Sequence, residues 1–174
     1  TSTWTSKVTL SLPSAEEKLS SDIVFVLDTS DCVGNVMKDV SKLVTQLETA
    51  QKDTGANIKV GVVAFKGSAL PMFDGKLVSV EEAKTTLAEM ADEVEKATNK
   101  DNKEAVVLEY LNADEADKDF IYKGSNLHSG LLGAQKLLQT DDAVDASRKY
   151  VVTVTDGMTY YWNDSEGNVY GVYS

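Results

Sequence analysis

The sequence predicts an α/β protein with a doubly wound, mainly parallel sheet and helices on both faces. Two predominantly apolar runs, residues 23–27 and 150–155, have the composition of strands that are buried on both sides. Apolar residues recur at intervals of three and four in residues 36–47 and 80–97, which is the pattern of helices with one buried face. Strands that alternate with such helices favour a parallel, doubly wound sheet.

The other elements of the first half follow in chain order. Residues 1–12 alternate polar and apolar side chains and predict a lead-in strand, and a polar linker follows it up to residue 21. Gly55 ends the first helix, and residues 58–65 predict a second buried strand. Residues 70–80 are interrupted by Asp74 and Gly75 and predict a short hairpin.

The second half contains a less regular segment before its last predicted helix. Residues 99–123 are acidic and weakly periodic, so we interpret them as an insertion with a short helix or strand. Ser125 is predicted to cap a helix that directs Leu127, Leu131, Ala134 and Leu138 inward. Residues 158–174 place aromatic side chains on both sides of a turn-like Asp-Ser-Glu-Gly, which favours a hairpin.

Length and composition limit the classes of protein to consider. The 174 residues suffice for one domain, which we place at residues 22–174 after a lead-in of residues 1–21. The net charge of −11 argues against nucleic acid as a partner and favours a cation or a basic protein surface. A single cysteine excludes an internal disulfide, and the apolar runs are far shorter than the ~20 residues that a membrane-spanning helix needs.

Four oxygen-bearing side chains are expected at one edge of the predicted sheet. Asp28 and Ser30 follow the first buried strand, Ser125 precedes a helix, and Asp156 follows the strand at residues 150–155. In an open α/β sheet, the edge formed by the strand ends is where ligands bind. Two carboxylates and two hydroxyls suit a hard divalent cation such as Mg²⁺ or Mn²⁺ better than zinc.

This arrangement resembles the von Willebrand factor A (vWA) domain and its metal-ion-dependent adhesion site. The family pattern is Asp-x-Ser-x-Ser, then a distant Thr, then a distant Asp. Asp28 and Ser30 match directly, Ser125 stands where the family usually has Thr, and Asp156 matches the last element. Cys32 occupies the second serine position, where its soft sulfur is a poor ligand for Mg²⁺.

The resemblance implies a binding module rather than an enzyme. Its cofactor would be Mg²⁺, or Mn²⁺ or Ca²⁺, and an acidic side chain of a protein or extracellular-matrix ligand would complete the ion's shell. The Trp4 lead-in, the acidic insertion and the segment at residues 155–161 look similar to surface adhesins and pilus tip proteins of Gram-positive bacteria. That similarity implies an extracellular, cell-wall-attached location.

Two other interpretations remain open. If Cys32 abolishes metal binding, the domain has a degenerate site and a structural or assembly role in a pilus or surface protein. Alternatively, Cys32 and His128, the only cysteine and histidine, could form a thiol nucleophile activated by imidazole. No oxyanion signature or third orienting group accompanies that pair, so we favour binding over catalysis.

The resemblance also implies further helices and strands beyond Asp156. Only residues 158–174 follow the site, so the sequence predicts a vWA fold that lacks its C-terminal part. The strand at residues 150–155 has the composition of a strand with neighbours on both sides. We therefore expect a missing segment or another chain to cover it.

Overall fold

A computed structural model of the chain describes residues 19–30, 33–114, 117, 120, 124–155 and 157–171. Five strands form the main sheet: β1 (Ser20–Asp28), β2 (Asn57–Phe65), β3 (Ala69–Pro71), β4 (Val78–Ser79) and β5 (Lys149–Val154). The helices are α1 (Val33–Thr54), α2 (Val80–Lys96), α3 (Lys100–Tyr110) and α5 (Leu127–Leu138), with single 3₁₀ turns at Phe73–Gly75 and Ala146–Arg148. A separate hairpin consists of β6 (Tyr161–Asn163) and β7 (Val169–Gly171). The strand predicted within residues 1–12 lies outside the described residues.

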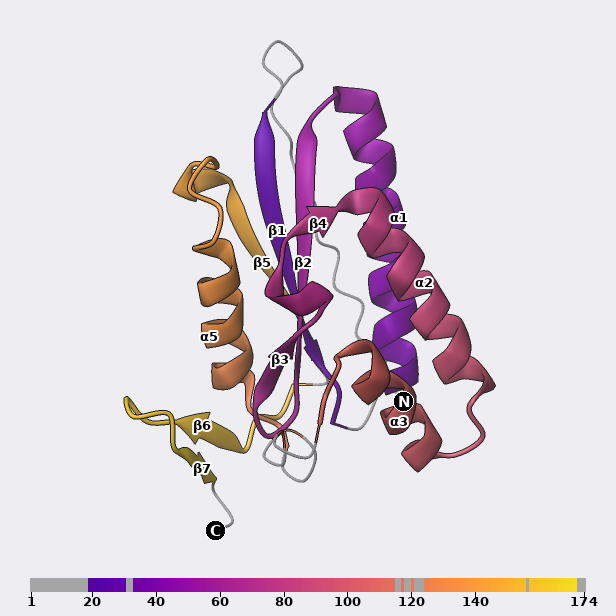
Figure 1. Ribbon diagram of the computed structural model, residues 1–174, viewed down its shortest axis with the longest axis vertical. Coiled ribbons are helices and arrows are strands. Elements are labelled where there is room, and N and C mark those ends of the chain that lie inside the picture. Colours follow the sequence, from indigo (N-terminus) through magenta and orange to yellow (C-terminus); the bar gives the residue numbers. More distant parts are fainter. Residues whose placement is uncertain are drawn as a thin grey trace.

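The fold is mixed α/β with a mostly parallel sheet, as the sequence predicts. The strand order is β3-β2-β1-β5, and β1 pairs in parallel with both β2 and β5. Helices α1 and α2 cover one face of the sheet and α5 covers the other (Figure 1). Because β1 and β2 are covered on both faces, their central residues are almost completely buried.

Alternation along β1 divides the core into two layers. Ile23, Phe25 and Leu27 face the helices α1 and α2, while Val24 and Val26 face α5. Helix α5 lies very close to the sheet, since a Cβ atom at Gly130 would come within 2.7 Å of Val26 Cγ1. Glycine at this position therefore allows α5 to lie close against β1 and β2.

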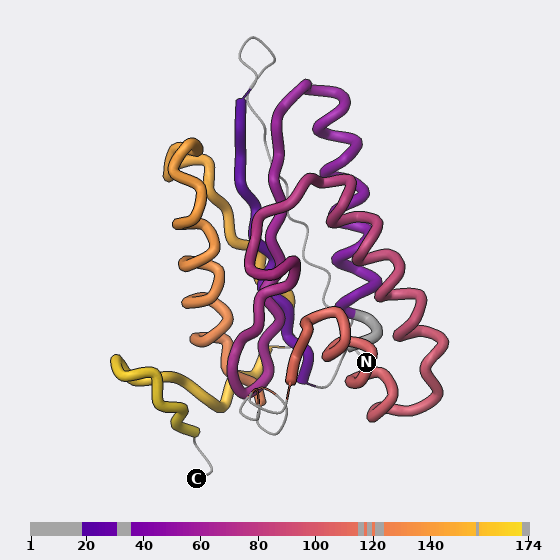
Figure 2. Tube along the Cα trace, viewed as in Figure 1, coloured from indigo at the N-terminus to yellow at the C-terminus, as the bar shows by residue number. Residues whose placement is uncertain are grey.

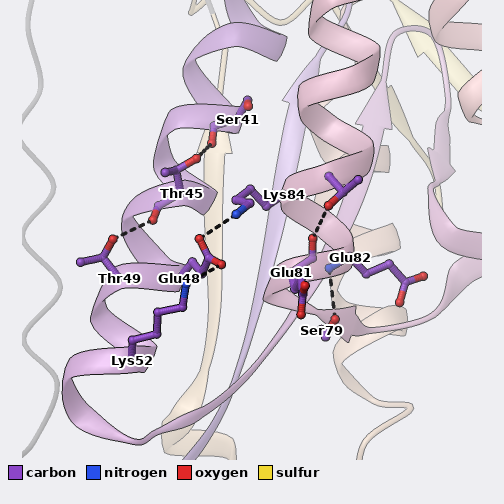
Figure 3. Close-up of polar contacts among 10 residues, drawn as sticks. Ser41, Thr45, Glu48, Thr49, Lys52, Ser79, Glu81, Glu82 and Lys84 are labelled. Carbon is purple, nitrogen blue, oxygen red and sulfur yellow. Dashed lines mark hydrogen bonds and ion pairs between the residues drawn. The ribbon is translucent and has the colours of Figure 1, made fainter.

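An ionic bridge joins the two helices on the other face. Glu48 of α1 lies between Lys52 of its own helix and Lys84 of α2, at 2.9 Å and 2.8 Å (Figure 3). Ser79 caps α2 by accepting a hydrogen bond from the amide of Glu82. The cap and the bridge fix the start of α2 against α1.

The structure corrects two details of the sequence analysis. Residues 70–80 do not form a hairpin with each other, because β3 and β4 each pair antiparallel with β2, which offers a longer open edge. Asp74 and Gly75 lie in the 3₁₀ turn between them, both at positive φ. Leu131 of α5 does not point inward but is 41% exposed, whereas Ala134 and Leu138 are buried as predicted, together with Gly130 and Leu137.

Within the described residues, no helix is long and apolar enough to span a membrane.

Candidate metal site at the carboxyl ends of the strands

Asp28 is the centre of the candidate site. It is the last residue of β1, where the parallel strand ends, and only 3% of its surface is exposed. Its carboxylate accepts hydrogen bonds from three separate segments of the chain. Convergence of residues so distant in sequence on one buried carboxylate is the arrangement expected of a binding site at this edge of an α/β sheet.

Each carboxylate oxygen of Asp28 has defined donors. Oδ1 accepts from Ser30 twice, from its amide at 3.0 Å and from its hydroxyl at 2.6 Å. Oδ2 accepts from the hydroxyls of Ser125 and Thr155, each at 2.8 Å. Three hydroxyls thus direct their hydrogens at Asp28, and each hydroxyl oxygen can still use a lone pair toward another group, as Thr155 does with the amide of Gly157.

The predicted site residues fall into two groups. Asp28, Ser30 and Ser125 do come together in the structure. Asp156 and Cys32 lie outside the described residues, so their predicted roles stay predictions. Among the described side chains, no three His, Cys, Asp or Glu residues form a metal-binding group, and the oxygen donors here are one carboxylate and several hydroxyls.

Ser125 reaches Asp28 because a different residue caps the helix. The sequence analysis assigned the α5 cap to Ser125, but Asn126 is the cap and accepts from the amide of Ser129 at 3.0 Å. Asn126 therefore supports the helix start. The correction matters because the Ser125 hydroxyl is left to bond Asp28.

Gly124 allows the segment before α5 to approach the loop after β1. A side chain at this position would lie 3.3 Å from Cβ of Ser30 and 3.2 Å from Cγ of Lys66. Those distances are tighter than ordinary packing, so the glycine permits the approach of Ser125 to Asp28. The amide of Asn126 donates to the carbonyl of Lys66 at 2.7 Å and ties the same segment to the residue that follows β2.

Thr155 is a site residue that the sequence analysis missed. Its hydroxyl donates to Asp28 and accepts from the amide of Gly157 at 3.1 Å, so it connects β5 with β1 and with the following turn. Its position directly after an apolar strand, like that of Ser30 near the end of β1, was the signal that could have found it.

The β6–β7 hairpin is attached to the same segment that carries Ser125. The amides of Tyr160 and Tyr161 donate to the carbonyl of Ser125 at 3.0 Å and 3.3 Å. Asn163 accepts from Nδ2 of Asn126 at 2.8 Å, and its amide donates to Nδ1 of His128 at 3.2 Å. In both ribbon and tube views the hairpin lies beside the start of α5 (Figures 1 and 2).

The contacts of His128 give it a structural role. It is exposed, and its Nδ1 is occupied by the amide of Asn163. Cys32, the thiol of the nucleophile hypothesis, lies outside the described residues, so that hypothesis stays untested.

Comparison with known proteins gives matches to solved structures only. No family model matches the sequence, and no curated protein matches it. The PilB minor pilin from Streptococcus sanguinis matches with a TM-score of 0.56 and 20% identity, over 88% of this chain and 34% of the pilin. The pilus adhesin SpaC from Lactobacillus rhamnosus GG, in an open conformation, matches with a TM-score of 0.50 and 19% identity, over 91% of this chain and 18% of SpaC.

A third similar structure is the pilus adhesin RrgA from Streptococcus pneumoniae, with a TM-score of 0.51 and 12% identity, over 86% of this chain and 22% of RrgA. This chain therefore spans about a third or less of each of these proteins. At these identities the likeness is one of fold.

Proposed function

We propose that this chain is a vWA-type binding module of a Gram-positive surface or pilus protein, and that it acts in adhesion through a divalent-cation site at Asp28. The single observation that carries the proposal is the convergence of the Ser30, Ser125 and Thr155 hydroxyls on one buried carboxylate. The fold likeness to pilus adhesins and a minor pilin supports the cell-surface setting.

The donor set fits a hard cation. Hydroxyl and carboxylate oxygens are the ligands that Mg²⁺ and Mn²⁺ prefer, and Mg²⁺ keeps part of its hydration shell in proteins. Ser30, Ser125 and Asp28 would hold the ion from one side, together with Asp156. An ion held this way presents positive charge to a partner, and an acidic side chain of a protein or matrix ligand would satisfy it. The role proposed here is binding, without catalysis.

Titration calorimetry with Mg²⁺ and Mn²⁺ tests the metal site directly. The parent chain is compared with Cys32→Ser, which restores the hydroxyl of the family pattern, and with Asp28→Asn. We expect the parent and the Cys32→Ser variant to bind the ions and Asp28→Asn to lose binding. Binding by Cys32→Ser alone would show that sulfur has abolished the site, and the second candidate below would replace this one.

The second candidate function is structural, in assembly of a pilus or surface protein with a degenerate site. One observation favours it: four donors already satisfy Asp28, so the buried carboxylate needs no cation to be stable. A second observation concerns β5, which pairs only with β1 among the described strands and has Val151 42% exposed. We propose that a further segment or another chain pairs with this edge.

A further inference from the structure

The outer face of the β6–β7 hairpin carries an exposed aromatic pair. Trp162 and Tyr170 are opposite each other across the two strands, and their rings stack with centroids 6.3 Å apart and planes at 23°. They are 46% and 49% exposed, although indole and phenol rings of this size are usually more deeply covered. Large aromatic side chains left at a surface are typical of binding sites.

The hairpin holds this pair in place because its other face is packed. The ring of Tyr161 lies against Gly171, so closely that a Cβ there would clash with it. Asn163 bonds to both Asn126 and His128, which anchor the hairpin to the buried start of α5. A two-stranded hairpin alone is marginally stable, and these contacts supply the missing support. The aromatic pair is therefore held in a fixed position at the surface.

The charged residues of the hairpin itself are negative. Residues 150–174 contain no lysine or arginine, and the hairpin turn carries Asp164 and Glu166. Asp164 directly follows β6, and a side-chain hydrogen bond with Tyr170 places its carboxylate beside the aromatic pair. Hydrogen bonds from Asn168 above all, and also from the Glu166 amide and Tyr170, hold the pKa of Asp164 below its ordinary value. Asp164 is therefore a carboxylate at neutral pH.

We propose that the Trp162–Tyr170 face binds an arginine-bearing segment of a partner protein. A guanidinium is planar, stacks on aromatic faces and pairs with carboxylates, so it matches both the exposed rings and the acidic turn. Charge complementarity selects it over an acidic or neutral segment, in agreement with the net charge of −11. This surface does not depend on the cation site at Asp28, and a partner can engage either one.

Fluorescence anisotropy of a labelled peptide of alternating glycine and arginine tests the proposal, with the full chain in EDTA so that metal binding plays no part. The same peptide with citrulline, which keeps the shape and loses the charge, is the control ligand. We expect Trp162→Ala to weaken binding of the arginine peptide by about threefold to thirtyfold, the range of a cation–π contact. Trp162→Phe should retain part of the affinity, and the citrulline peptide should bind much more weakly than the arginine peptide.

A matched pair of charge variants separates this surface from general attraction to an acidic protein. Glu166→Gln removes a charge from the hairpin turn, and Asp53→Asn removes one from the last turn of α1, which ends at the far end of the sheet (Figure 1). We expect the first to weaken binding by about twofold and the second to have a smaller effect. Three results would each overturn the proposal. The first is an equal effect of Glu166→Gln and Asp53→Asn, and the second is unchanged affinity in both Trp162→Phe and Trp162→Ala. The third is equal binding of the citrulline and arginine peptides. The citrulline comparison uses the unmodified chain, so the test holds even if a variant fails to fold.

Discussion

The hydroxyl of Ser125 donates to Oδ2 of Asp28 at 2.8 Å, although the two residues are 97 positions apart. Both are 3% exposed. This bond connects the end of β1 with the segment before α5. The β6–β7 hairpin is attached to the same segment through the carbonyl of Ser125. The stability of the sheet edge and the proposed metal site therefore depend on the same contact.

Ser125→Ala should destabilise the chain by about 1 to 3 kcal/mol, because one oxygen of a buried carboxylate loses a donor. It should also weaken Mg²⁺ binding. Urea denaturation measures the free energy of unfolding, and calorimetry measures the metal. The control is Ser41→Ala on α1, whose side chain has no comparable buried partner among the described contacts. Equal loss of stability in the two variants would show that the Ser125–Asp28 bond contributes nothing measurable.

Asn126→Asp separates capping from anchoring. Aspartate keeps the oxygen that caps α5 but loses the Nδ2 hydrogens that bond Asn163 and the carbonyl of Gly67. Since residue 126 is fully buried, we expect a loss of at least about 2 kcal/mol. Hydrogen exchange should accelerate at the amides of Tyr161 and Asn163 more than at amides of α2. Uniform acceleration throughout the chain would argue against an anchor at this position.

Asp22 should make the free energy of unfolding change with pH. Neither carboxylate oxygen of this fully buried residue has a hydrogen-bond partner among the described residues. Burial first, and then Asp141, raise its pKa above the ordinary 3.8, against the opposing effect of Lys59 and Lys149 on the flanking strands. The folded state therefore binds this proton more tightly than the unfolded state does, so Asp22 favours folding at low pH. Its contribution is lost as pH rises from the ordinary carboxyl range through the raised pKa.

Asp22→Asn removes that titration. Thermal denaturation of parent and variant between mildly acidic and neutral pH should show the variant gaining stability relative to the parent as pH rises. Parallel curves would mean that Asp22 does not titrate differently in the folded and unfolded states.

Glu48→Gln should lower the melting temperature by weakening the bridge between α1 and α2. Hydrogen bonds from Lys84 and then Lys52 lower the pKa of Glu48, so its contribution is present above the ordinary carboxyl pKa and is lost as pH falls through the lowered value. The effect should diminish in high salt. Glu95→Gln, which breaks a more exposed pair with Lys38, is the matched control and should change little.

Sequence reasoning succeeded where burial alone determines the structure. The run around Val24 could only be a central strand, and the spacing of Val80, Leu87 and Val94 required a helix with one buried face. It was less successful where tertiary contacts choose among local options. Ser125 and Asn126 are both good caps, and the choice between them depends on Asp28, which lies on a distant strand. The prediction that Leu131 is buried was wrong because Gly130, which has no side chain, lets its own face of α5 lie against the sheet.

The most direct test of the central claim is to locate the bound ion. Mn²⁺ is added to isotopically labelled protein, and paramagnetic broadening of amide signals is recorded, with Mg²⁺ as the competitor. The account predicts selective broadening at Ser30, Ser125, Thr155 and their neighbours, reversed by Mg²⁺ and absent in Asp28→Asn. Broadening spread over acidic helix surfaces, with the amides around Asp28 unaffected, would contradict a cation site at this edge of the sheet.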